Sequence, residues 1–160
     1  MIPSSARKKE LYRQSLEQVN EIIKGETDSI AVMASVACIL KANLPHALWV
    51  GFYRVDVRKA DELVIGPYQG TLGCLRIPFG KGVCGHCAEL RQPVIVPDVE
   101  KFPDHIACDG RSRSEIVLPV FEAQHRLCAV LDLDSAELNA WSDEDRAGLA
   151  TILKEIQDIL

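Results

Sequence analysis

The chain has 160 residues and a net charge of −5, from 18 Lys and Arg against 23 Asp and Glu. Hydrophobic residues make up 48% and charged residues 26%, a balance typical of globular proteins that excludes a disordered or collagen-like chain. The acidic excess disfavours a nucleic-acid partner, and the sequence has neither a membrane-length apolar run nor the apolar core of a signal peptide. We therefore expect one soluble, cytoplasmic domain over residues 1–160, with no nucleic-acid or membrane partner.

Hydrophobic periodicity predicts two helices first, over residues 5–24 and 28–42. Gly25 is expected to end the first helix and Asp28 to cap the second. The second helix has a predicted apolar face of Ile30, Met33, Ala34, Ala37 and Leu40.

Alternating and β-branched segments predict strands next, with turns at Gly66-Pro67 and Pro78. The strands are expected over residues 46–57, 61–65, 72–77, 93–96, 115–121 and 127–134, with helices over 83–91 and 142–160. Strands grouped between terminal helices favour an α+β fold with an antiparallel sheet. Residues 97–114 lack periodicity, and a loop of this length in a compact domain is usually functional.

The six cysteines suggest thiol chemistry or metal binding, because a disulfide framework is unusual in a chain without an export signal. They are Cys38, Cys74, Cys84, Cys87, Cys108 and Cys128. Cys38 and Cys128 lie in apolar segments and are expected in the core. The C-x-x-C pair Cys84/Cys87 lies mid-chain, away from the position it takes in thioredoxin-type oxidoreductases. The only other candidate zinc pair is His105-x-x-Cys108, so no metal site is predicted.

Two further features have open interpretations. The segment Gly80-Lys-Gly-Val-Cys-Gly85 precedes a predicted helix, and it is either an anion-binding loop or a tight turn. Asp132 and Asp134 lie on one face of a predicted apolar strand, where mutual repulsion would hold one of them protonated near neutral pH. Such a pair suits binding an ammonium group or delivering a proton, and the alternative is an edge strand with solvated acids. Glu115, at the head of another apolar strand, is a similar case.

Seven segments carry a resemblance that covers residues 10–160. They are Trp49-Val-Gly-Phe-Tyr53, Gly66-Pro-Tyr-Gln-Gly70, Ile77-Pro-Phe-Gly-Lys-Gly-Val-Cys-Gly85, Val96-Pro-Asp98, Phe102-Pro-Asp-His-Ile-Ala-Cys-Asp109, Ser112-Arg-Ser-Glu-Ile-Val-Leu-Pro119 and Val130-Leu-Asp-Leu-Asp-Ser135. In sequence and order they resemble the free methionine-(R)-sulfoxide reductases, which are stand-alone GAF domains. The resemblance implies a GAF-like fold, with a central antiparallel six-stranded sheet and helices at both chain ends packed on one face.

The resemblance also implies a thiol mechanism without a bound cofactor. Cys108 matches the nucleophile that becomes a sulfenic acid, Cys74 a resolving cysteine, and Cys84 a third cysteine with a backup role. Which of Cys74 and Cys84 mainly resolves, and which acid donates the proton, stays open. Thioredoxin is the implied reductant and free methionine sulfoxide the implied substrate. The implied substrate-binding residues are Trp49, Tyr53, Glu115, Asp132 and Asp134.

The chain departs from the family pattern at His86 and Cys87, where small residues are usual. Cys87 is expected to be inert, the alternative being a pairing with Cys84, and His105 could tune the pKa of the nucleophile. A non-catalytic GAF sensor is the rival function, although 160 residues leave no room for its output module. An oxidoreductase based on the C-x-x-C pair is a third. The amphipathic N-terminal helix could form a homodimer.

Overall fold

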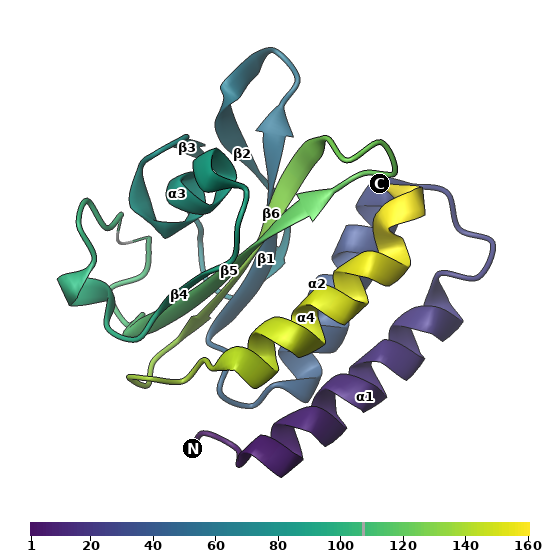
Figure 1. Cartoon of the computed structure of the whole chain (residues 1–160), viewed down its shortest axis with the longest axis horizontal. Helices are drawn as coiled ribbons and strands as arrows, with labels where there is room; N and C mark the ends of the chain where they lie inside the picture. The colour runs from purple at the N-terminus through teal and green to yellow at the C-terminus, as the bar shows by residue number, and fades with distance from the viewer. Residues whose placement is uncertain (107) are drawn as a thin grey trace.

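The computed structural model describes residues 1–106 and 108–160, and it contains a six-stranded antiparallel sheet with helices on both faces (Figure 1). Ala107, inside the predicted loop, lies outside the described residues. The sheet order is β3-β2-β1-β6-β5-β4, which confirms the predicted α+β class. The strands are β1 (Trp49–Asp56), β2 (Lys59–Gln69), β3 (Arg76–Pro78), β4 (Val94–Val96), β5 (Ser114–Phe121) and β6 (Leu127–Ser135). The helices are α1 (Ser5–Ile22), α2 (Ser29–Asn43), α3 (Gly82–Leu90) and α4 (Asp143–Ile156), with 3₁₀ turns at Val99–Lys101 and Gln157–Ile159.

The helices form two unequal layers. Helices α2 and α4 contact one face of the sheet, and α1 packs on both of them from outside (Figure 1). Helix α3 lies on the opposite face, against β5, β6 and β3. Over the described residues, we find no helix with the length and apolar character needed to cross a membrane.

Strict alternation along the central strands builds a separate core on each face of the sheet. On β1, Val50 and Phe52 point to the three-helix layer, whereas Trp49 and Tyr53 point to the α3 side. On β6, Leu131 belongs to the first core, with its neighbours in sequence facing α3. Asp132 and Asp134 alternate with Leu131 and Leu133, so both acids of β6 face the α3 side.

Helix α2 matches its predicted apolar face in part, since Met33, Ala37 and Leu40 are buried but Ile30 and Ala34 are exposed. Asp28 caps it as predicted, with its side chain accepting from the N–H groups of Ile30 and Ala31. The buried stripe is rotated, however, since α2 packs against both α1 and the sheet: Val32 and Val36 are buried, whereas Ile30 is exposed. The prediction that Cys38 lies in the core is wrong, because it is on the exposed side of this helix.

Two predicted chain reversals also differ. Helix α1 is capped at Ile23, so Gly25, with φ of +74°, lies two residues beyond the cap that it was predicted to form. No turn occurs at Gly66-Pro67, because β2 continues through both residues. The register against β1 shifts there, from Gly51 opposite Tyr68 to Tyr53 opposite Ile65. A β-bulge accommodates the extra residue, which explains a glycine and a proline inside a strand.

A buried ion pair fastens α1 to α4. Lys8 is 4% and Asp145 0% exposed, and their side chains form a salt bridge. Lys8 Nζ also donates to Ala140 O at 2.7 Å, and Tyr12 donates to Asp145 Oδ1 at 3.0 Å. Ser142 donates to Asp145 through both N–H and hydroxyl, which completes the capping box of α4. Burial would raise the pKa of Asp145, but hydrogen bonds with His46, Lys8 and Ser142, together with the charge of Lys8, lower it to about 2.

Candidate functional site

A pocket opens on the α3 side of the sheet, over the first half of β1, the start of β5 and the end of β6. Strand register brings its polar residues together: Asp134 on β6 lies opposite Trp49 on β1 and opposite Glu115 on β5. Asp132, two residues before Asp134, lies on the same face. The pocket is lined by Trp49, Tyr53, Leu72, Gly73, Ile77, Gly82, Val83, Cys84, His105, Ile106, Cys108, Asp109, Ser112, Glu115, Asp132 and Asp134.

Trp49 forms an aromatic wall of this pocket. Its ring stacks against Tyr53 and Tyr68, with centroid separations of 5.7 and 5.2 Å, and its Nε1 donates to Thr71 O at 2.9 Å. The ring occupies the space above Gly51, where a Cβ atom would lie 2.4 Å from it. Gly51 is therefore what allows the tryptophan to fold over its own strand.

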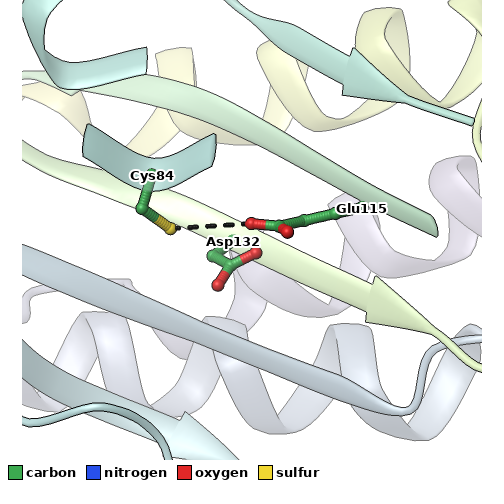
Figure 2. A group of neighbouring side chains, drawn as sticks. All are labelled: Cys84, Glu115 and Asp132. Atoms are coloured by element: carbon green, nitrogen blue, oxygen red, sulfur yellow. Dashed lines mark hydrogen bonds between the residues drawn. The ribbon is translucent and has the colours of Figure 1, made fainter. Parts of the chain in front are cut away.

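The floor of the pocket is a cluster of Cys84, Glu115 and Asp132, all nine-tenths or more buried. Figure 2 shows Cys84 pointing from α3 toward Glu115 on β5, with Asp132 of β6 beside them. The Cys84 thiol donates toward Glu115 Oε1, with a sulfur–oxygen distance of 3.9 Å. Burial, followed by the charge of Asp134, raises the pKa of Glu115 and of Asp132 well above the usual carboxyl range. Burial likewise raises the pKa of the Cys84 thiol.

Asp134 is the more open acid of the set. Burial raises its pKa to about 6, with Asp109 adding to the effect and Ser112 and His105 opposing it. His105 approaches the cluster from the loop before β5, with Nε2 3.7 Å from Glu115 Oε2. Burial lowers the pKa of His105, so the imidazole is held mostly neutral at pH 7. The pocket therefore combines Asp134, whose pKa of about 6 favours ionisation at pH 7, with two carboxyl groups whose raised pKa favours the protonated form.

A disulfide between Cys74 and Cys108 closes one side of the pocket. The two Cα atoms are 5.4 Å apart, and Cys108 is exposed to solvent whereas Cys74 is half-buried. A hydrogen bond beside the disulfide, from Thr71 Oγ1 to Asp109 Oδ2 at 2.5 Å, joins the same two loops. Arg111 also donates to Asp109 at 2.7 Å, within its own loop. The disulfide therefore borders both solvent and the pocket that contains the acids.

The remaining cysteine and glycine features have structural explanations. Cys87 is fully buried in α3, and burial raises the pKa of its thiol. It is not disulfide-bonded, and neither is Cys84. Cys128 is half-buried at the edge of the core. In the glycine-rich segment, the N–H groups of Gly80, Lys81 and Gly82 all donate to backbone carbonyls, as in a tight turn rather than an anion-binding loop.

The pocket suits a small ligand with a cationic group and an apolar end. Among the described lining residues there is no Lys or Arg, so no positively charged side chain of the pocket wall balances the acids. Sequence reasoning did not identify Ser112 and Ile106 as lining residues, and neither has a chemical signature that would distinguish it from other loop residues. Trp49, Tyr53, Glu115, Asp132 and Asp134, by contrast, all line this one pocket together with Cys84 and Cys108.

Comparison with known proteins gives a consistent result. The family model for the GAF domain matches residues 10–157. The chain is 45% identical to GAF domain-containing protein A of Dictyostelium discoideum, over 94% of this chain and 93% of that protein. It is 38% identical to free methionine-R-sulfoxide reductase of Escherichia coli, over 96% and 90%. The solved structure of free methionine-R-sulfoxide reductase from Neisseria meningitidis, in complex with its substrate, superposes with a TM-score of 0.89 at 45% identity, over 95% and 89%.

Proposed function

The chain belongs to the GAF-domain family and, within it, to the oxidoreductases named free methionine-R-sulfoxide reductases, and from this premise we propose a complete thiol cycle for its pocket. Free L-methionine-(R)-sulfoxide is the substrate. Cys108 is the nucleophile, Cys74 the resolving cysteine, and a dithiol protein of the thioredoxin type the reductant. The observation that carries the proposal is the Cys74–Cys108 disulfide at the mouth of a pocket floored by buried carboxyl groups.

The reduction begins at the sulfoxide sulfur. The Cys108 thiolate attacks it while a carboxylic acid protonates the oxygen. The hydroxyl group then passes from the substrate sulfur to the Cys108 sulfur as the bond between the two sulfurs breaks, so methionine leaves and Cys108 becomes a sulfenic acid. The Cys74 thiol then attacks the sulfenic sulfur, water leaves, and the disulfide forms. A dithiol reduces that disulfide by exchange and is itself oxidised to a disulfide, which restores both cysteines.

The acids divide into two roles by their protonation. Glu115 and Asp132 hold protons because they are buried side by side, and they supply the acid that a sulfoxide oxygen requires. Asp134, with its pKa near 6, is ionised at neutral pH and attracts the substrate ammonium. A peptide-bound methionine lacks that ammonium, so this carboxylate selects for the free amino acid. Trp49 and Tyr53 contact the methyl end.

Cys84 has a less favourable position for resolution than Cys74. Its thiol is 3% exposed and directed at Glu115, and its raised pKa disfavours the thiolate that exchange requires. These features support Cys74 as the main resolving cysteine and Cys84 as the backup. A homodimer through α1 stays a prediction.

The test couples NADPH oxidation to thioredoxin and its reductase. Free methionine-(R)-sulfoxide, its S epimer and a peptide-bound sulfoxide are offered in parallel, and we expect turnover of the free R epimer alone. Cys108→Ser should abolish turnover and Cys74→Ser should slow the recycling step, whereas Cys87→Ser should retain activity. Turnover by Cys108→Ser would contradict the assignment of the nucleophile. Ligand binding without any turnover by the reduced protein would instead support the sensor hypothesis.

A further inference from the structure

We propose that the Cys84–Glu115–Asp132 cluster binds one divalent transition-metal ion of the zinc type at the floor of the pocket. The three residues come from α3, β5 and β6, and one ligand atom of each lies within 4.8 Å of the other two (Figure 2). The inference starts from Cys84, a buried thiol that the main reaction route does not require.

The spacing of the three donors is close to what a tetrahedral ion needs. With metal–sulfur and metal–oxygen bonds of about 2.3 and 2.0 Å, neighbouring sulfur and oxygen ligands lie about 3.5 Å apart. Cys84 Sγ and Glu115 Oε1 are already 3.9 Å apart. A small side-chain adjustment therefore brings the donors to bonding distance, without any change in the strands that carry them.

Asp132 supplies a second, independent indication. It is only 5% exposed, and its Oδ1 atom has no hydrogen-bond partner among the described residues. A buried oxygen without a partner is unfavourable, and it faces a pocket whose described lining contains no Lys or Arg. A cation bound between this oxygen, Glu115 and the sulfur would satisfy it directly.

The mixture of donors selects the kind of metal. A thiolate beside two carboxylates suits zinc and related transition metals, whereas Mg²⁺ and Ca²⁺ prefer sites made of oxygen alone. His105, whose Nε2 lies 3.7 Å from Glu115 Oε2, is a candidate donor for a fourth position. On binding, the Cys84 S–H bond breaks, its electron pair forms the metal–sulfur bond, and the proton passes to solvent. Any proton on Glu115 or Asp132 is released in the same way.

A metal in this position would occupy Glu115 and Asp132, the two acids that the proposed function assigns to the sulfoxide oxygen, within the pocket that receives the substrate. Occupancy would therefore oppose binding of free methionine sulfoxide, a consequence that rests on the proposed function. Metal binding itself does not rest on it, nor does it require Cys74 or Cys108, whose sulfurs are joined to each other in this structure.

Cobalt(II) titration tests the site, with the protein in its disulfide-closed form and no added reductant. Because Cys74 and Cys108 are then unavailable, a sulfur-to-cobalt charge-transfer band in the near ultraviolet reports a remaining thiol. We expect saturation at one equivalent, loss of the band in Cys84→Ser, and its retention in Cys38→Ser, which removes an exposed cysteine as the matched control. Asp132→Asn should weaken cobalt binding at least tenfold, and free L-methionine should lower the apparent cobalt affinity of the unmodified protein.

Absence of the band, or its persistence in Cys84→Ser, would overturn the site. An unchanged affinity in Asp132→Asn would exclude the carboxylate as a ligand and overturn it equally. Circular dichroism of each variant establishes that it is folded. Turnover of free methionine sulfoxide by the metal-free, reduced protein is measured in parallel. Turnover without the band refutes the metal site alone, whereas the band without turnover refutes the proposed function alone.

Discussion

The ionisation of Asp134 should set how well the pocket accepts its substrate. Burial raises the pKa of this carboxyl to about 6 in the empty pocket. About nine-tenths of the molecules are then ionised at pH 7 but only about one-tenth at pH 5, a tenfold loss of the charge that attracts an ammonium group. We expect this tenfold decrease between pH 7 and pH 5 to contribute to kcat/KM for free methionine sulfoxide, since kcat/KM reports the ionisation of the free enzyme.

Asp134→Asn removes the titrating charge and provides the comparison. Both proteins are first reduced chemically, and methionine formed in a single turnover at low substrate is measured by mass spectrometry, so the reductant does not enter. Cys108 also loses thiolate as the pH falls, but it does so in both proteins, and the ratio of the two rates cancels that effect. The ratio of wild type to Asp134→Asn should fall about tenfold between pH 7 and pH 5. A ratio that is constant with pH would refute the role of Asp134.

Two further predictions concern the scaffold. Lys8→Met leaves the Asp145 carboxylate buried without its cation and should destabilise the protein by about 3 kcal/mol in urea unfolding, the low end for a broken buried pair because hydroxyl and N–H donors remain. Since the pKa of Asp145 is lowered to about 2, its contribution is present above pH 4 and is lost as the pH falls through about 2. Lys8→Met should therefore show a weaker loss of stability over that range, and an equal loss in both proteins would contradict the assignment. Gly51→Ala places a Cβ 2.4 Å from the Trp49 ring and should raise KM at least tenfold, whereas Gly110→Ala, which meets nothing within 4 Å, should leave KM unchanged.

The fold could largely be predicted from the sequence because its elements have strong local signals. The aromatic, β-branched and apolar composition of β1, β5 and β6 and the cap at Asp28 indicated both the elements and their order. The failures occurred where tertiary contacts outweigh local patterns. Gly66-Pro67 has the composition of a turn, yet pairing of the flanking Ile65 and Tyr68 with β1 keeps it within β2 as a bulge. The face of α2 depended on where α1 packs, which periodicity alone does not specify.

The candidate site was predictable only in part. Resemblance identified Cys108 and Cys74, and the i, i+2 spacing placed Asp132 and Asp134 on one face. That Cys84 and Glu115 meet depends on how α3 lies across β5, and the two residues are 31 positions apart in sequence. Metal-binding motifs that can be recognised in a sequence have ligands at short, characteristic spacings. The proposed site takes its ligands from three separate elements, so it contains no such motif.

The Cys74–Cys108 disulfide also restricts the conformations of the unfolded chain and so affects the stability of the fold. It links positions 34 residues apart, and a crosslink of that span lowers the entropy of the unfolded chain enough to favour the closed form by about 4 kcal/mol in the chain-entropy account. In the proposed cycle, the oxidised form with the disulfide is then the more resistant to heat and proteases. The reduced form, which attacks the substrate, is the less stable of the two. In a cell with little reductant, the protein would accumulate in the oxidised form. It would then resist degradation for longer, although it would be inactive until reduced.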